Sequence, residues 1–157
     1  MAVKTFLVYN GKSALLDEDN YLYVTGRVAD SFKTSKGKFI EPLTLEKYFG
    51  SIEELEEVCV TGRGMPQPIA IAQLSEIGKT LPREEIIEFL QEKLEVINAG
   101  LVNYKKLSTL VLAKEPWTED NKILGPTLKI KRDNVEKMYR GKFKSWYEDK
   151  QSVLFEK

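Results

Sequence analysis

The chain has 157 residues, 42% of them hydrophobic and 31% charged, which supports one soluble globular domain with a core and not two large domains. It contains no histidine, which excludes Ser-His-Asp and Cys-His catalysis within this chain and removes the commonest zinc ligand. Its single cysteine, Cys59, excludes an internal disulfide and fits a reducing cytosol. Cys59 lies between Val58 and Val60, so we expect a small buried core side chain. No apolar run approaches the length of a membrane span, and the N-terminus lacks a signal-peptide pattern.

The net charge is zero, but opposite charges gather in different segments. Residues 41–60 hold six acidic residues and one lysine, net −5, whereas residues 122–150 hold nine Lys or Arg and four acidic residues, net +5. The basic segment could bind phosphates, nucleic acid or an acidic partner, and a solvated helix face is the simpler alternative. Nucleic-acid binding is the weakest of these functions, because no RNA- or DNA-binding motif accompanies the basic segment.

The first part of the chain is expected to form a β-hairpin. Residues 5–9 and 21–25 are rich in aromatic and β-branched residues, and turn-forming residues 17–20 precede the second of these strands. Gly26-Arg27 then breaks the pattern.

A second group of short elements follows this hairpin. Residues 31–34 are expected to form a strand, and Lys36-Gly37-Lys38 a tight turn after it. Residues 43–49 have helical spacing that ends at Gly50.

The second half of the chain predicts a β-β-α-β-α unit. Residues 57–61 and 69–74 are strands that a Gly- and Pro-containing turn joins as an antiparallel hairpin. The clearest helix begins at Pro82, ends near Gly100 and carries an apolar stripe. The stripe consists of Ile86, Leu90, Leu94, Ile97 and Leu101. A strand over residues 107–113 and an amphipathic helix over residues 133–146 complete a small mixed sheet flanked by helices, which is the α+β class.

One segment suggests chemistry on a phosphate. Residues 125–132, Gly-Pro-Thr-Leu-Lys-Ile-Lys-Arg, place Lys129 on a loop just before the basic helix. A mobile ammonium on a short loop can neutralise negative charge that develops in a neighbouring site. On composition alone a lysine near a helix start is more often solvated, so this segment needs support from the rest of the chain.

That support is a resemblance to the C-terminal part of AMP-forming acyl-CoA synthetases, specifically the long-chain fatty acid–CoA ligases. Residues 17–27, DEDNYLYVTGR, resemble the hairpin that leads to the interdomain hinge of the family, and residues 30–39, DSFKTSKGKF, resemble the segment after it. Residues 101–105, LVNYK, are similar to the stretch after the long helix, and residues 116–132 are similar to the lysine signature. The resemblance covers nearly the whole chain, and four segments in the right order make it specific.

The resemblance implies roles for individual residues. Lys129 matches the lysine of a rotating lid that reaches the acyl carboxylate and α-phosphate during adenylation, and Arg27 matches the hinge arginine that contacts the nucleotide. A turn of the family lines the CoA tunnel after the lid has rotated. The residues that match it are Ser35, Lys36, Gly37 and Lys38. The hinge falls at Ala29 and Asp30. For Lys36 and Lys38 a solvated turn is an equal alternative to a CoA contact.

The resemblance also divides the chain and implies its ligands. Residues 1–27 would belong to the body of a complete ligase, and residues 28–157 would be the lid domain. ATP, AMP, CoA and fatty acid would be substrates, with Mg accompanying ATP and held mainly by the N-terminal adenylation domain, which is supplied in cis or as a separate chain. We expect no metal site, no tightly bound cofactor, no nucleic acid and no transmembrane segment in this chain. The expected location is cytoplasmic, or peripheral to a membrane through the full enzyme.

Two departures leave a second interpretation open. Lys12 stands where the family has an aspartate that holds the ribose hydroxyls, and a lysine side chain has no hydrogen-bond acceptor. Ala29 stands at the hinge, where the family usually has a polar residue. No Gly-rich phosphate loop of either common kind occurs in the chain. The chain is therefore expected to be either the lid of a ligase, inactive without the N-terminal domain, or a non-catalytic binding or regulatory module derived from that lid.

Overall fold

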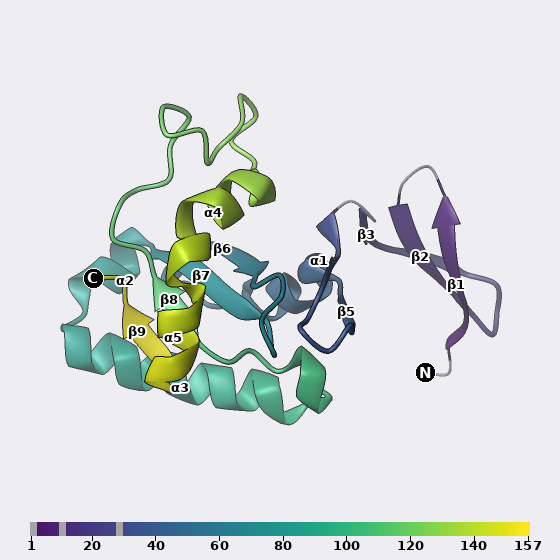
Figure 1. The fold of residues 1–157 in the computed structure, drawn as a ribbon, viewed down its shortest axis with the longest axis horizontal. Helices are drawn as coiled ribbons and strands as arrows, with labels where there is room; N and C mark the ends of the chain where they lie inside the picture. The colour runs from purple at the N-terminus through teal and green to yellow at the C-terminus, as the bar shows by residue number, and fades with distance from the viewer. Residues whose placement is uncertain (1–2, 10–11, 28–29) are drawn as a thin grey trace.

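The computed structural model describes residues 3–9, 12–27 and 30–157, which form a small N-terminal sheet and a larger α+β unit (Figure 1). The N-terminal sheet is antiparallel, in the order β1-β2-β3, with β1 (Val3–Tyr9), β2 (Lys12–Asp17) and β3 (Leu22–Arg27). The predicted pairing of residues 5–9 with 21–25 is wrong, because β2 lies between them and pairs with both. Lys12–Asp17 has only a short apolar run and no clear alternation, whereas the Asn10-Gly11 pair before it is a strong hairpin signal in the sequence.

The predicted tight turn at Lys36-Gly37-Lys38 is confirmed. Strand β4 (Phe32–Lys33) pairs antiparallel with β5 (Phe39–Ile40), and the amide of Gly37 donates to the Thr34 carbonyl at 3.0 Å. Gly37 has a φ of +76°, a conformation that glycine adopts without a Cβ penalty. The predicted helix over residues 43–49 is also present, as α1 (Pro42–Glu46) and the 3₁₀ turn η2 (Lys47–Phe49).

A four-stranded mixed sheet forms the centre of the larger unit, in the order β6-β7-β8-β9. Its strands are β6 (Leu55–Thr61), β7 (Ile69–Leu74), β8 (Leu110–Leu112) and β9 (Val153–Phe155). The β6–β7 pair is antiparallel, as predicted, whereas β8 and β9 run parallel to their neighbours. The α+β expectation is confirmed by this arrangement.

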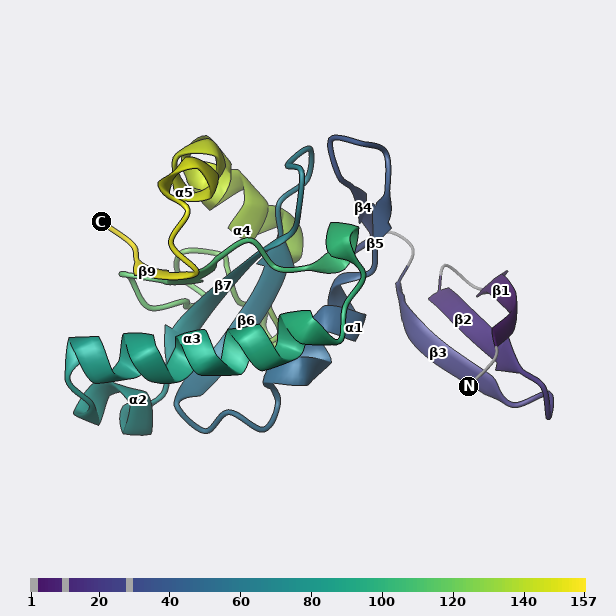
Figure 2. The ribbon, with the colours of Figure 1, turned by 90° about the horizontal axis from the view of Figure 1, so that it is seen from below.

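Helices cover both faces of this sheet (Figure 2). Helix α3 (Arg83–Ala99) covers one face, and α4 (Arg132–Tyr139) with α5 (Phe143–Asp149) covers the other. The remaining helical elements after β7 are α2 (Glu76–Thr80), η3 (Asn103–Lys105) and η4 (Arg140–Lys142). Alternate strand residues enter two separate apolar clusters: Val60, Ala70 and Ala72 pack with α3, while their neighbours Cys59 and Ile71 pack with α4 and α5. This alternation is the period-two pattern of a strand buried on both faces.

The long helix α3 matches its prediction closely. Pro82 is its N-cap residue and Gly100 its C-cap residue, and Ile86, Leu90 and Leu94 are buried. Leu101, the last residue of the predicted stripe, lies beyond the end of the helix and is partly buried.

The C-terminal elements differ from their predictions. The single helix expected over residues 133–146 is interrupted by the 3₁₀ turn η4, which contains Gly141, a poor helix former. Strand β9 was not predicted, because three apolar residues near the chain end form a strand only when β8 supplies a parallel partner. The short helix α2 was also missed, and the strand predicted over residues 107–113 is shorter, at Leu110–Leu112.

A close approach at Gly78 gives the first prediction. A Cβ at this buried position of α2 would clash with the carbonyl oxygen of Glu54, a backbone atom that cannot move aside. We expect Gly78→Ala to lower the free energy of unfolding by about 1–3 kcal/mol in urea titrations. Gly141→Ala is the control, because a Cβ there meets no atom within 4 Å; equal stability losses in the two variants would contradict this packing.

Candidate functional site

The Lys129 loop is a narrow hairpin held by its own backbone. Leu124 and Ile130 form an antiparallel bridge, the amide of Gly125 donates to the Lys129 carbonyl at 2.9 Å, and the amide of Leu128 donates to the Gly125 carbonyl at 2.8 Å. Leu128 has a φ of +59° and is 62% exposed, so the turn holds a non-glycine residue in the left-handed region at a cost of roughly 1–2 kcal/mol. The predicted loop is therefore an ordered turn, with Lys129 exposed beside its tip.

Arg132 anchors this loop to the rest of the unit. Its Nη1 donates to Glu46 Oε1 on α1, to the Val60 carbonyl at 2.7 Å and to Cys59 Sγ at 3.3 Å on β6. Glu46 Oε1 also accepts the amide of Val60 at 2.9 Å, which closes a ring of polar contacts. The side chains of Arg132 and Glu46 are only 13% and 15% exposed. Because Arg132 follows Lys129 by three residues, this ring fixes where the loop leaves the sheet.

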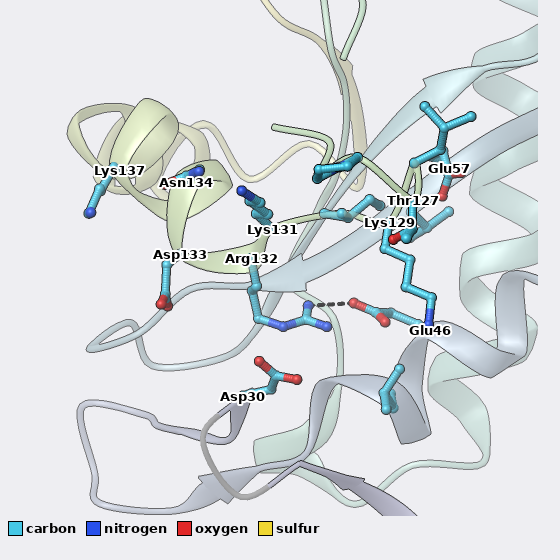
Figure 3. A pocket seen from close by; sticks show the side chains of 16 residues that line it. Asp30, Glu46, Glu57, Thr127, Lys129, Lys131, Arg132, Asp133, Asn134 and Lys137 are labelled. Carbon is cyan, nitrogen blue, oxygen red and sulfur yellow. Dashed lines mark hydrogen bonds and ion pairs between the residues drawn. The ribbon is translucent and has the colours of Figure 1, made fainter. Parts of the chain in front are cut away.

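A pocket of about 1000 Å³ opens beside the loop (Figure 3). Residues 125–134, together with residues of α1 and β6, line it, and Asp30 and Lys137 complete the wall. In Figure 3 the side chain of Lys129 extends toward Glu46, and Asp30 faces the guanidinium of Arg132. The Lys129 side chain makes no hydrogen bond or ion pair within the residues that the structure describes. The ammonium of Lys129 is therefore available to a group outside this chain.

Charges of both signs shift the acidity of groups around the pocket. Burial raises the pKa of Glu57 above its usual value, and Glu56 and Glu46 raise it further. Burial lowers the pKa of Arg132, but the net shift is upward because Cys59, Glu46 and Asp30 favour the charged guanidinium. The Nε of Arg132 is buried and has no hydrogen-bond partner within the described part of the chain. Arg132 thus stays charged, and one of its donors is unused on the side that Asp30 faces.

The turn predicted to line a CoA tunnel lies elsewhere. Ser35, Lys36, Gly37 and Lys38 are all exposed at the end of the β4–β5 hairpin, and none of them lines the Lys129 pocket. The Nζ of Lys38 lies 5.6 Å from the ring centroid of Tyr104, a cation–π contact. The structure therefore brings Asp30 to the Lys129 pocket but places the Lys36–Lys38 turn on another part of the surface.

The remaining predicted site residues belong to the first sheet and the segment after it. Arg27 is the last residue of β3, where the register of β2 and β3 sets it opposite Lys12. Ala29 lies outside the described residues. Sequence reasoning missed Glu46 and Glu57, which come from an unremarkable acidic segment, and it gave Arg132 no role of its own. The only signal for Arg132 was a basic residue next to an apolar helix face.

The described residues form neither a metal-binding cluster nor a helix that could span a membrane. No three histidine, cysteine, aspartate or glutamate side chains of these residues are grouped so that they could hold a metal ion. No helix formed by them is both long and apolar enough to cross a membrane.

The sequence of residues 29–151 matches the AMP-binding enzyme C-terminal domain, and the chain belongs to this family. Among curated proteins it is 27% identical over 145 residues to long-chain-fatty-acid–CoA ligase 5 of Mus musculus, covering 81% of this chain and 21% of the ligase. It is 22% identical to fatty acyl-CoA synthetase B of Dictyostelium discoideum, covering 88% of this chain and 23% of the synthetase. The chain therefore spans about a fifth of the length of these relatives.

Solved structures of adenylate-forming enzymes share the fold. The A domain of a carboxylic acid reductase from Segniliparus rugosus, solved in complex with AMP and a co-purified carboxylic acid, matches with a TM-score of 0.72 at 21% identity. The match covers 89% of this chain and 23% of that one. The adenylation domain of a carboxylate reductase from Mycobacterium chelonae matches with a TM-score of 0.73 at 17% identity, over 89% of this chain and 23% of that one. The α+β unit is thus the C-terminal fold of the adenylate-forming enzymes.

The Arg132 anchor predicts a specific loss of stability. We expect Arg132→Ala to lower the free energy of unfolding by about 3 kcal/mol, because Glu46 would remain buried without its partner. Lys131→Ala, which removes an exposed neighbouring cation, should change it by less than about 0.5 kcal/mol. Urea denaturation of the two variants measures the difference, and similar values would show that the anchor does not stabilise the fold.

The environment of Cys59 predicts slow thiol chemistry. Burial raises the pKa of the Cys59 thiol from 9.0 to about 12, although Arg132 acts in the opposite direction. At pH 8 the thiolate fraction should be about a thousandfold smaller than in the unfolded chain, and alkylation by iodoacetamide correspondingly slower. Since the folded-state pKa is the higher one, the stability linked to this thiol is present below pH 9 and is lost as the pH rises toward 12. Equal alkylation rates in buffer and in denaturing urea would contradict the burial of Cys59.

Proposed function

We propose that this chain acts as the lid of a long-chain fatty acid–CoA ligase, in which Lys129 assists adenylation and the turn of residues 35–38 assists thioester formation. The proposal is carried by the Lys129 ammonium, which has no partner among residues 3–9, 12–27 and 30–157 and stands on an anchored loop beside an open pocket. The family match over residues 29–151 and the similarity to two named fatty acid ligases support it.

Lys129 has the properties that adenylation requires of a lid residue. When a carboxylate oxygen attacks the α-phosphorus of ATP, the bond from that phosphorus to the oxygen of the β-phosphate breaks, and negative charge builds up on the oxygen that leaves with pyrophosphate. A lysine ammonium is a compact point charge, and it stabilises such charge most strongly where closure of the lid excludes water. The ordered hairpin would deliver Lys129 at a fixed position, while its exposure leaves it free to enter a neighbouring domain.

The remainder of the reaction needs a second domain. The phosphate loop, the acyl pocket and most of the ATP site, together with Mg, would be supplied by an N-terminal adenylation domain in the same or another chain. Arg27 would contact the nucleotide at the boundary between the two domains. The chain alone should bind neither ATP nor fatty acid tightly and should make no acyl-CoA.

The turn of residues 35–38 would act in the second step. Its lysines are exposed, and the positive φ of Gly37 keeps the turn narrow. After rotation of the lid about Ala29 and Asp30, Lys36 and Lys38 could face the phosphates of CoA, which their charge favours.

A non-catalytic module is the second candidate function. Lys12 and Ala29 favour it, since one removes the family carboxylate and the other the polar hinge side chain. The module would use the basic C-terminal helices toward an acidic partner or CoA. The two candidates differ in whether Lys129 affects the rate of adenylate formation.

The test is complementation with an N-terminal adenylation domain of a fatty acid ligase. We expect the mixture to form acyl-adenylate from fatty acid and ATP, and Lys129→Ala to lower the rate by about 10²–10³. Lys131→Ala, a nearby exposed lysine on the same loop, should leave the rate within about twofold. The readout is pyrophosphate release under single-turnover conditions.

The two candidates predict opposite results in this assay. An unchanged rate in Lys129→Ala would remove Lys129 from the mechanism. If the chain failed to restore adenylate formation to every N-terminal adenylation domain tested, the result would favour the non-catalytic module. Turnover by the purified chain alone would contradict both candidates.

A further inference from the structure

The two proposed functional loops lie on different parts of the lid, yet a continuous set of contacts joins them. The first part of this connection holds the turn of residues 35–38. Two backbone hydrogen bonds join the β6–β7 turn to the β4–β5 hairpin. The amide of Gly64 donates to the Lys33 carbonyl at 2.9 Å, and the amide of Ser35 donates to the Met65 carbonyl at 2.9 Å. Figure 2 shows this turn beside the β4–β5 hairpin. The position of Ser35 therefore depends on the position of the β6–β7 turn.

The second part joins the β6–β7 turn to α4. Arg63, at the tip of that turn, donates Nε to Glu136 Oε1 at 3.2 Å. Glu136 is only 4% exposed although it is charged, and its other ion-pair partner is Arg140, the residue directly after α4, at 3.5 Å. Arg63 is the partner of Glu136 that comes from a distant part of the chain, 73 positions away.

The third part returns to the Lys129 loop. Glu136 lies four residues after Arg132, so both side chains leave the same face of α4. Arg132 binds α1 and β6, and Glu136 binds the β6–β7 turn. Helix α4, which begins directly after the Lys129 loop, is thus fixed at two points one helical turn apart.

The burial of Glu136 needs an explanation beyond stability. Removing a carboxylate from water costs several kcal/mol, and well-packed apolar residues at such positions are often as stable or more stable. A buried ion pair does, however, define the relative position of two elements more narrowly than apolar packing, because both distance and direction matter. The pair therefore fits a positioning role.

We propose that Arg63 and Glu136 are positioning residues that hold the turn of residues 35–38 in a fixed relation to the Lys129 loop. The meaning of this link for catalysis rests on the proposed function, but the link itself is a property of this chain. It keeps the CoA-facing turn in place when α4 and the Lys129 loop move away from the first site, so that one rigid lid serves both steps.

The test on the chain alone uses amide hydrogen exchange with two matched variants. Arg63→Gln removes the contact of Glu136 with the β6–β7 turn, whereas Arg140→Gln removes the contact of the same carboxylate with the residue four positions later in the chain. Both arginines are more than half exposed, so neither substitution creates a cavity. We expect exchange at the Ser35 and Gly64 amides to rise about fivefold in Arg63→Gln and to stay unchanged in Arg140→Gln. Arg63→Lys should restore part of the protection, because it retains the charge.

Two results of this experiment would overturn the link. One is equal exchange at Ser35 and Gly64 in the two glutamine variants. The other is a uniform rise across strands β6 to β9 in Arg63→Gln, since that would show a loss of global stability and not a local release.

A second measurement separates the link from the proposed function. In the complemented ligase, Arg63→Gln should slow thioester formation from a supplied acyl-adenylate by about fivefold while leaving adenylate formation within twofold. If Arg63→Gln raises exchange at the Ser35 and Gly64 amides but changes neither rate, the link is supported and the proposed role of the turn in thioester formation fails. If the amides are unaffected, the positioning proposal fails whatever the rates are.

Discussion

The guanidinium of Arg132 holds together three elements that lie far apart in the chain. It binds Glu46 on α1 and the backbone of Val60 on β6 while it begins helix α4, and Glu46 in turn accepts the amide of Val60. The ring of contacts is largely withdrawn from solvent, so its electrostatic attraction is stronger than that of a surface pair. It decides where α4 starts, and therefore where the Lys129 loop projects and where the pocket beside it opens.

This arrangement separates residues that hold the site from the residue that would act in it. Arg132 and Glu46 pair with each other, and Lys129 has no bonded partner among the described residues. A lysine held in its own buried ion pair would keep its charge but would already be bound to an anion, so it could not serve another domain. Because Glu46 pairs with Arg132, the Lys129 ammonium stays available. It stands on a hairpin whose backbone is held at Leu128 in the left-handed conformation, which is strained for a residue other than glycine.

Much of the α+β unit could be predicted from local sequence signals. Helix α3 has a proline at its start, a glycine at its end and an apolar stripe of helical period, and the β6–β7 hairpin has two apolar runs around a glycine-rich turn. The family could be predicted as well, because four motifs occur in a fixed order. Strand β9 could not, since it has three residues and becomes a strand only by pairing with β8, which lies about 40 positions earlier in the chain. Strand β2 was missed although the Asn10-Gly11 pair before it is a hairpin signal, because its apolar run is short and shows no clear alternation. The interruption of the last helix at η4 was missed for a different reason, because the helical spacing of apolar residues continues from α4 across η4 into α5.

The sequence by itself determined the fold class, the family and the exposed lysine loop, because turns, caps and apolar periodicity act over a few residues. Only the tertiary structure decided that Arg132 lies against Glu46 and Cys59, that Glu136 lies buried against Arg63, and that Lys129 and the Lys36–Lys38 turn occupy separate surfaces. These contacts join residues more than 70 positions apart, as between Arg132 and Cys59 or between Arg63 and Glu136. A charged residue looks the same in the sequence whether it is solvated or buried against a partner. Which of the two it becomes depends on how the sheet packs between its two layers of helices.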